Sequence, residues 1–384
     1  MQDEIKAWKP NELTRLRRLV TKWYSENGRA LPWRKTFDPY EIWVSEIMLQ
    51  QTQVATVIPY YLRFLRSFPN IGSLAIAPLD DVYHHWAGLG YYRRARQMHQ
   101  AAKMINSEHN GVFPTEYNSV STLPGIGRYT AGAVLSFSRD QRQPIVEANT
   151  QRLYARLLHL KLETSSKQGQ SYLWAFAELV LPLRTGSGRI NQALMEIGSQ
   201  ICVPKNPICL RCPLKGLCPT FASSSQATIP VPKKPKLYTE LREAALVIRD
   251  NKGRILMRRC APEERWAGLW DFPRFDVTEC NTPAAESKNV AAQFQVRFGK
   301  SVLVGKKIHE LKHAVTRYRI KLKSYEAELD SSIPGKWKSG VETSWVNPLR
   351  PSNLALSSSG KRLWSWLSNH AHSESPEVGT ACKL

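Results

Sequence analysis

Residues 38–53 read DPYEIWVSEIMLQQTQ, and we expect this stretch to form the helix around which the chain is organised. Asp38 is a favourable N-cap residue, and Pro39 is favourable at the first helical position. Glu41 follows Asp38 at the spacing of a capping box. The sequence therefore predicts a helix that begins beside Asp38 and continues to Gln53.

One acidic residue, Glu46, interrupts the apolar face of this predicted helix. Helical spacing places Glu46 in one stripe with Ile42 and Leu49, so its side chain is expected to face inward. Burial removes solvation from a carboxylate and raises its pKa, which would let Glu46 act as a general acid near neutral pH. The alternative is a partly buried glutamate that pairs with an arginine or caps a neighbouring helix.

Length and charge narrow the class of protein. The 384 residues are enough for two domains, each with its own core. A formal net charge of +22 indicates a polyanionic partner and favours nucleic acid. We find neither a bilayer-spanning apolar run nor a secretory signal, so we expect no membrane partner and a cytoplasmic protein, associated with the nucleoid if bacterial.

The spacing of apolar residues divides the chain into two parts. From residue 12 to about 198 they recur at helical spacing, and residues 223–236 have the composition of a linker. Short apolar runs at 244–248 and 253–257 and an alternating stretch at 316–326 then predict an α+β domain. We therefore expect a multidomain chain with an all-α domain at 1–222, a linker at 223–240, an α+β domain at 241–368 and a polar tail at 369–384.

The alternating stretch carries four cations on one face. This face could follow a phosphate backbone, or it could protect a solvated edge strand against aggregation. The four cations are Arg317, Arg319, Lys321 and Lys323.

Four of the seven cysteines lie within one short segment, with the spacing C-x6-C-x2-C-x5-C. Four thiolates in one loop suit a [4Fe–4S] cluster or a tetrahedral zinc ion. Zinc sites more often have two close pairs, so this spacing favours the cluster. The four ligands would be Cys202, Cys209, Cys212 and Cys218, in the loop at 202–218. Three cations between them could contact phosphates or only offset thiolate charge, namely Lys205, Arg211 and Lys215.

Residues 123–135 read LPGIGRYTAGAVL, a turn followed by a helix rich in small residues. Gly125 and Gly127 would let the backbone approach a DNA phosphate, which the N–H groups of the opening helix would bind. With helices on both sides, this pattern predicts a helix-hairpin-helix element that binds DNA without reading its sequence. The alternative is that the glycines serve only close packing.

A second candidate acid, Glu147, lies in PIVEANTQRLYARL at residues 144–157. We expect Asn149 to cap a helix that begins at Thr150, which places Glu147 just before a helix N-terminus. The helix dipole and free N–H groups would then keep Glu147 ionised, the opposite of what burial does to Glu46. Two carboxyl groups with separated pKa values suit the acid and the electrostatic stabiliser of a glycosidic cleavage, although Glu147 could also serve the helix start alone.

The motifs together resemble the MutY-type adenine DNA glycosylases of the helix-hairpin-helix superfamily, which are similar to endonuclease III. The resemblance rests on WVSEIMLQQTQV, GLGYY, LPGIGRYTAG and the four-cysteine loop, and it spans about Leu31 to Cys218. It implies two helical lobes that bind DNA and a flipped base between them, a [4Fe–4S] cluster, and a C-terminal domain similar to the MutT (Nudix) fold. It also implies a partner, duplex DNA containing an adenine mismatch, bound by a monomer.

The resemblance assigns roles to individual residues. Glu46 matches the catalytic Glu that protonates adenine, and Glu147 stands where the family usually has an Asp that stabilises the oxocarbenium ion. Asn149 matches an Asn beside the attacking water, and Tyr129 a Tyr near the sugar. The adenine-pocket positions are Trp33, Arg34, Leu49 and Gln192, and the side chains that enter the base stack are Gln51 and Tyr91.

The implied reaction is hydrolysis of the N-glycosidic bond of adenine mispaired with 8-oxoguanine or guanine. Endonuclease III enzymes have, at the position of Tyr129, a Lys that forms a Schiff base. A phenol cannot form this imine, so we expect a monofunctional glycosylase. Two competing hypotheses are a bifunctional glycosylase and lyase, and an iron–sulfur DNA-binding protein without catalysis.

The second domain begins with GLWDFP at Gly268, which resembles the start of a Nudix segment. Where that family has metal-binding carboxylates this chain reads AAQFQVRFG at residues 291–299, so we expect no nucleotide hydrolysis. In the MutY family a Phe-Ser-His loop senses 8-oxoguanine, and the corresponding residues here are Val315, Thr316 and Arg317. Thr316 retains the hydroxyl, whereas the aromatic ring and the imidazole are missing, so discrimination against guanine is expected to be reduced or carried by other residues.

Overall fold

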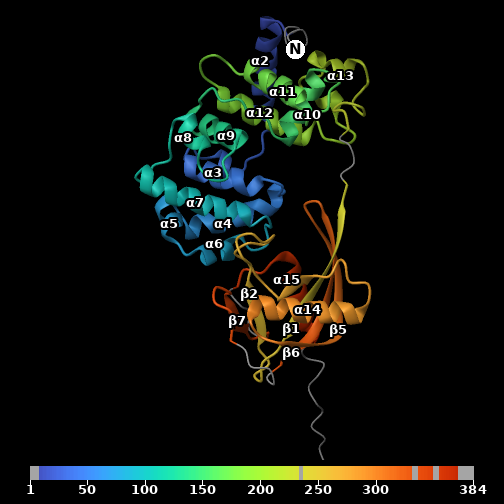
Figure 1. The fold of residues 1–384 in the computed structure, drawn as a ribbon. Helices are drawn as coiled ribbons and strands as arrows, with labels where there is room; N and C mark the ends of the chain where they lie inside the picture. Colours follow the sequence, from blue (N-terminus) through green and yellow to red (C-terminus); the bar gives the residue numbers. More distant parts are fainter. Residues whose placement is uncertain (1–7, 233–236, 331–335, 349–353, 371–384) are drawn as a thin grey trace, which may run out of the picture. The chain divides into compact units, whose positions relative to one another are not determined.

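The computed structural model describes residues 8–232, 237–330, 336–348 and 354–370. It divides into two compact units, a helical unit that ends at Pro235 and a mixed unit that begins at Lys236 (Figure 1). Parts of the expected linker and tail, residues 233–236 and 371–384, lie outside the described residues. Ile229, in the expected linker, is buried in the core of the helical unit, so this part of the linker packs on that unit.

In its described residues the helical unit contains helices and no strands, as the apolar spacing predicts. In Figure 1, α3 to α9 form one group, and α2 with α10 to α13 forms another. Its elements are α2 (Pro10–Asn27), η1 (Pro32–Arg34), α3 (Pro39–Leu49), α4 (Val54–Ser67), α5 (Ile71–Ile76), α6 (Leu79–Trp86), α7 (Arg93–Glu108), α8 (Tyr117–Ser121), α9 (Arg128–Arg139), α10 (Ala148–Leu157), α11 (Lys167–Leu179), α12 (Ser187–Gln200), η2 (Cys209–Arg211), η3 (Lys215–Leu217) and α13 (Pro219–Ala222).

Helix α3 begins where the sequence predicts. The Asp38 carboxylate accepts a hydrogen bond from the Tyr40 N–H at 2.8 Å, which confirms Asp38 as the N-cap. The helix ends at Leu49 rather than Gln53, because Gln51 has a φ of 57° and this left-handed conformation cannot continue a helix. All residues from 42 to 48 are buried, so α3 is enclosed on every side rather than amphipathic.

Helix α12 lies close to both α9 and α10, because glycines stand at the points of contact. A Cβ atom at Gly188 would lie 2.2 Å from the Ser136 carbonyl oxygen. One at Gly198 would lie 2.8 Å from the Asn149 carbonyl oxygen. A side chain at either position would clash with the backbone of the neighbouring helix. Gly188 thus allows α12 to approach α9, and Gly198 allows it to approach the start of α10.

In its described residues the mixed unit contains two sheets and two helices, which confirms the α+β prediction. A four-stranded sheet has the order β4-β1-β6-β5, and a three-stranded sheet has the order β3-β2-β7. Strands β1 and β6 are parallel, and the other pairs are antiparallel. The elements are β1 (Thr239–Ile248), β2 (Ile255–Arg259), β3 (Trp270–Asp271), β4 (Arg274–Asp276), α14 (Pro283–Phe298), β5 (Val302–Val315), β6 (Tyr318–Leu329), β7 (Thr343–Val346) and α15 (Ser358–His370).

Strand β1 is buried on both faces from residue 243 to 248, which explains its continuous apolar run. Alternate residues contribute to two cores. One core contains Ala244, Leu246 and Ile248 with Phe294 and Phe298 of α14. The other contains Ala245 and Val247 with Leu363 and Leu367 of α15.

The alternating basic strand is central rather than at an edge. Strand β6 lies between β1 and β5, so the edge-strand alternative is wrong. Three of its cations are close to carboxylates, because neighbouring elements supply an acid beside each one. The pairs are Arg319 with Glu240 at 3.7 Å, Lys321 with Glu310 at 3.1 Å and Lys323 with Glu286 at 2.7 Å. These side chains balance charge within the unit, whereas Arg317 lies in the turn before the strand.

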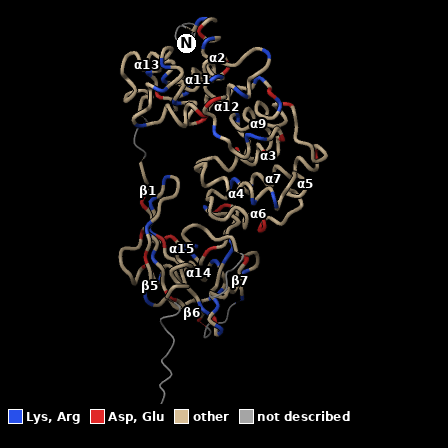
Figure 2. Tube along the Cα trace, turned by 180° about the vertical axis from the view of Figure 1, so that it is seen from behind, with Lys and Arg blue, Asp and Glu red and all other residues tan. Residues whose placement is uncertain are grey.

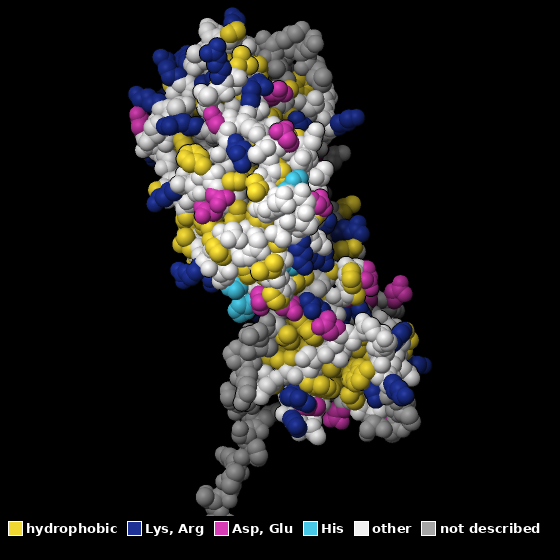
Figure 3. All heavy atoms as spheres, turned by 90° about the vertical axis from the view of Figure 1, so that its left-hand side faces the viewer, with side chains coloured by type: hydrophobic (Ala, Val, Ile, Leu, Met, Phe, Trp, Pro, Cys, Tyr) yellow, Lys and Arg dark blue, Asp and Glu magenta, His cyan; other side chains and the backbone are white. Residues whose placement is uncertain are grey.

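The positive charge is distributed over both units. Lys and Arg occur on helices of the helical unit and on strands of the mixed unit (Figure 2). On the face drawn in Figure 3, basic side chains are scattered among apolar ones. Of the helices in the described part of the chain, none combines the length and the apolar character needed to cross a bilayer.

Candidate active site

Glu46 is buried near the end of α3, with 2% of its surface exposed, so the inward orientation is confirmed. Its Oε2 accepts a hydrogen bond from the Tyr129 hydroxyl at 2.5 Å. Burial raises the pKa of Glu46, and the Tyr129 hydrogen bond and the charge of Arg34 only oppose this rise. Packing of α3 against α9 brings together two residues that lie far apart in the sequence.

Glu147 is itself the N-cap of α10, which begins at Ala148. Its carboxylate accepts hydrogen bonds from the backbone N–H groups of Asn149 and Thr150, both at 2.8 Å. The Asn149 side-chain amide donates a third bond at 3.1 Å. The expectation that Asn149 caps a helix beginning at Thr150 is therefore wrong. The helix begins two residues earlier, and the Glu147 side chain itself accepts the hydrogen bonds of the first N–H groups.

The two carboxyl groups do not have pKa values shifted in opposite directions. Burial raises the pKa of Glu147, although hydrogen bonds from Asn149 and Thr150 and the charge of Arg152 oppose the shift. The expectation of a lowered value is wrong, because burial outweighs the helix start. Glu147 also raises the pKa of Glu46 through charge repulsion. The two acids are therefore coupled, and ionisation of one favours protonation of the other.

Three of the four positions that the resemblance assigns to an adenine pocket belong to elements beside Glu46. Trp33 and Arg34 form η1, which packs against α3, and Leu49 is the last residue of α3. The Trp33 indole N–H and the Arg34 Nε are buried and have no hydrogen-bond partner among the described residues. Buried donors of this kind are expected where a ligand supplies the acceptors.

The fourth adenine-pocket position, Gln192, is on α12 and accepts a hydrogen bond from the Tyr24 hydroxyl at 2.8 Å. One turn later on α12, Glu196 lies 2.7 Å from Arg29 and 4.0 Å from Arg34. Glu196 was not identified from the sequence. Its contact with Arg34 connects η1 to α12 and helps to hold Arg34 near Glu46.

Gln51 and Tyr91 occupy two turns at the surface. Both are exposed, and both have left-handed backbones, with φ values of 57° and 50°. Non-glycine residues rarely adopt this conformation, and such strain is often retained at binding sites.

The predicted helix-hairpin-helix lies between α8 and α9. Gly125 has a φ of 79°, which favours glycine, and a Cβ atom there would lie 2.8 Å from the Gln97 Cβ. Gly127 is the N-cap of α9 and provides no side-chain cap, and a Cβ atom there would meet open space. The first N–H groups of α9 are thus uncovered by a cap and suited to an anion such as phosphate.

All four cysteines of the loop line one small cavity together with residues of α10. Within the described ranges, no three His, Cys, Asp or Glu side chains converge on a position for a single metal ion. Four cysteines around one cavity are a donor set that either a [4Fe–4S] cluster or a zinc ion could use.

Two arginines on α10 connect this loop to the rest of the unit, and the sequence analysis missed both. Arg156, 2% exposed, donates to the Val203 carbonyl at 2.9 Å and lies 3.2 Å from the Cys202 Sγ. Arg152 donates to the Cys202 carbonyl at 2.6 Å and to the Asn149 Oδ1 at 3.0 Å. The available signal was two arginines one turn apart, at positions 152 and 156 of the same helix.

Thr316 lies in the mixed unit, in the two-residue turn between β5 and β6. Its φ is 52°, and its hydroxyl donates to the Val315 carbonyl at 2.8 Å. Arg317 donates to the Tyr318 hydroxyl at 2.9 Å and lies over the same ring. The turn thus presents a hydroxyl, a guanidinium and an aromatic ring together.

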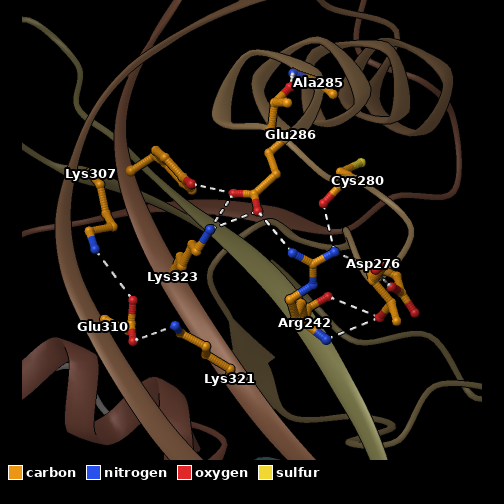
Figure 4. A network of polar contacts seen from close by, with 12 residues as sticks. Arg242, Asp276, Cys280, Ala285, Glu286, Lys307, Glu310, Lys321 and Lys323 are labelled. Carbon is orange, nitrogen blue, oxygen red and sulfur yellow. Dashed lines mark hydrogen bonds and ion pairs between the residues drawn. The ribbon is translucent and has the colours of Figure 1, made fainter.

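The helix expected to carry metal-binding carboxylates in a Nudix enzyme is α14, and its one carboxylate is occupied. Glu286 accepts hydrogen bonds from Lys323 at 2.7 and 2.8 Å and from the Tyr325 hydroxyl at 2.6 Å (Figure 4). Burial alone would raise the pKa of Glu286, but the Lys323 and Tyr325 hydrogen bonds and the Arg242 charge lower it. The Glu286 carboxylate is thus hydrogen-bonded by side chains of the unit itself.

Two family descriptions match the two units. The HhH-GPD superfamily of base excision DNA repair proteins matches residues 44–178, and the NUDIX domain matches residues 244–366. The fold and the site thus define a helix-hairpin-helix protein of the base excision repair class with a Nudix-like domain.

Individual relatives narrow this class. An adenine DNA glycosylase of Buchnera aphidicola (subspecies Schizaphis graminum) is 40% identical over 260 residues, which cover 67% of this chain and 74% of that protein. The rat adenine DNA glycosylase is 36% identical over 274 residues, covering 68% and 52%. A solved thermostable thymine-DNA glycosylase covers 56% of this chain and 98% of its own, with a TM-score of 0.51 and 26% identity. This chain belongs to the adenine DNA glycosylase family.

Proposed function

We propose that this protein hydrolyses the N-glycosidic bond of adenine mispaired with 8-oxoguanine or guanine in duplex DNA. The observation that carries the proposal is the coupled pair of buried Glu46 and partly buried Glu147, with the Tyr129 hydroxyl bonded to Glu46. The family membership supports an N-glycosylase of base excision repair, and the first N–H groups of α9 offer a phosphate contact. In this proposal the protein acts as a monomer on a base extruded from the duplex.

Glu46 is proposed as the general acid. Burial raises its pKa and so favours the protonated form that a general acid needs, and repulsion from Glu147 acts in the same direction. Tyr129 donates to Oε2, which leaves Oε1 to carry the proton toward the adenine ring. Protonation turns adenine into a neutral leaving group, so the bond to the sugar can break.

Glu147 is proposed to stabilise the oxocarbenium-like sugar. Three N–H donors hold its carboxylate in one position before the reaction begins, so little reorganisation is needed as positive charge develops. A carboxylate has about four acceptor sites, and these donors use three of them. The remaining site can orient the attacking water together with Asn149.

Release of adenine from defined duplexes tests this function. Wild-type protein is expected to release adenine in single turnover from duplexes with 8-oxoguanine or guanine opposite adenine, and far more slowly from a duplex with thymine. Parallel samples in which residues 315–317 are changed to Phe, Ser and His should favour 8-oxoguanine more strongly, because the ring and imidazole return. Absence of adenine release from every duplex would refute the proposal.

The same samples test whether the enzyme is monofunctional. Borohydride should trap no covalent complex with DNA, and strands should break only after alkali or heat, because Tyr129 cannot form an imine. Efficient trapping would instead favour the bifunctional glycosylase and lyase.

We also propose that Cys202, Cys209, Cys212 and Cys218 hold a [4Fe–4S] cluster. A bound cluster would fix Cys202, whose carbonyl accepts a hydrogen bond from Arg152, and so support the Arg152 contact with Asn149. Cys212→Ser is expected to lose iron and sulfide on elemental analysis and to lower the melting temperature. Cys280→Ser, in the mixed unit, is the matched control and should keep both. One equivalent of zinc and no sulfide in the wild type would exclude the cluster.

A further inference from the structure

A buried arginine on α7, Arg94, has a role that neither the motifs nor the proposed chemistry includes. It is 9% exposed, and no carboxylate in the described part of the chain pairs with it. A buried charge is costly unless it is paired or fully hydrogen-bonded. Arg94 is compensated by backbone oxygens and one hydroxyl, and their positions indicate what it does.

One nitrogen of the guanidinium binds the C-terminal end of α3. Nη1 donates to the carbonyl oxygens of Ile47 at 2.9 Å and Met48 at 3.0 Å, and to that of Gln50. The last carbonyls of a helix have no intrahelical partner and lie at the negative end of its dipole, where a cation is stabilising. Arg94 therefore caps the helix that carries Glu46, from a different helix.

The other terminal nitrogen binds the turn that precedes Tyr91. Nη2 donates to the Leu89 and Gly90 carbonyls at 3.3 and 3.1 Å, and to the Thr52 hydroxyl at 3.3 Å. The guanidinium also lies 5.4 Å from the ring centres of both Trp86 and Tyr91. One side chain thus joins the turn that contains Gln51 to the turn that contains Tyr91.

Both turns contain an exposed residue with a left-handed backbone, and such conformations persist only where the surroundings hold them. A planar guanidinium can bond to two segments at once in a fixed geometry, which a lysine ammonium cannot reproduce. The spacing between the two turns is therefore set by Arg94.

We propose that Arg94 is a positioning residue that holds the 50–53 and 89–91 turns at a fixed spacing, so that Gln51 and Tyr91 enter the duplex together and extrude the adenine. This inference rests on the proposed function, because it requires a base that leaves the stack. It adds a residue that acts through the two turns without contacting the reacting atoms.

The test compares two DNA substrates that differ in the free energy needed to move the adenine out of the duplex. One duplex has adenine opposite guanine, and the other has adenine opposite an abasic site, where the unpaired base costs less to extrude. Arg94→Met is expected to slow adenine release from the first duplex by roughly 100-fold, the scale of a small misplacement of binding groups, and from the second by much less. With 2-aminopurine in place of adenine, the fluorescence rise at saturating protein should shrink in parallel.

Arg94→Lys keeps the positive charge. If Arg94→Met does not fold, Arg94→Lys is the variant that tests the positioning role. Arg94→Lys should also lose more of the adenine-release rate on the guanine duplex than on the abasic duplex, because its ammonium group cannot bond to both turns. Arg93→Met removes an exposed cation next to Arg94, and any effect on DNA affinity should be equal for both duplexes. An equal loss of rate on both duplexes, or no loss, would overturn the positioning role. Failure of the wild type to release adenine from either duplex would instead refute the proposed function.

Discussion

Glu46→Gln is expected to lower the single-turnover rate of adenine release by roughly 100- to 10,000-fold, the usual contribution of a general acid. Gln fills nearly the same volume and can still accept the Tyr129 hydrogen bond, so the fold of α3 should be retained. It cannot donate an acidic proton to the base. The measurement is adenine release at saturating protein, together with DNA affinity, which should stay close to that of the wild type.

The pH dependence gives an independent check on Glu46. Because burial raises its pKa, the wild-type rate should fall as pH rises through this raised value and the acidic proton is lost. Protonated Glu46 also stabilises the fold. That contribution is complete below the unfolded pKa of about 4.3 and is lost as pH rises through the folded value. Both effects should disappear in Glu46→Gln.

Glu41→Gln, on the same helix, is the matched control and should leave the rate and its pH profile unchanged. If Glu46→Gln kept the full rate, or if its pH profile matched that of the wild type, Glu46 would not be the acid.

Glu147→Gln is expected to slow adenine release by roughly 100- to 1,000-fold, the scale of removing one electrostatic contact to a developing charge. Gln has one acceptor oxygen, so its amide cannot receive all three N–H donors that Glu147 receives. Loss of the cap should also destabilise α10 by about 1 kcal/mol. The two effects are separated by measuring the rate well below the melting temperature of the variant.

Glu147→Asp is the informative companion, because it keeps the charge and shortens the side chain. Asp is a better N-cap than Glu, so α10 should be retained, and we expect a rate within about tenfold of the wild type. A rate as low as that of Glu147→Gln would mean that the extra methylene of Glu147 is required. A wild-type rate in Glu147→Gln would remove Glu147 from the mechanism.

The sequence by itself determined the features that depend on neighbouring residues. The start of α3 at Asp38, the turn at Gly125 to Gly127 and the close spacing of the four cysteines are local, because capping, left-handed turns and thiol spacing involve only a few residues. The inward position of Glu46 followed from helical periodicity. The spacing of apolar residues predicted the two units, and the family resemblance added the Nudix-like fold of the second one.

Only the tertiary structure decided the burial, the hydrogen-bond partners and the pKa shifts of those residues. Helix α3 ends before Gln51, which has a left-handed backbone and lies between Gln50 and Thr52, two hydrogen-bond partners of Arg94 on another helix. Glu147 has a raised pKa because α10 and its neighbours bury it, and no local pattern reports burial. The bond between Tyr129 and Glu46 and the Arg152 link to Asn149 likewise depend on packing between segments distant in sequence. Local chemistry therefore indicated the candidate residues, and long-range packing determined their geometry and the direction of their pKa shifts.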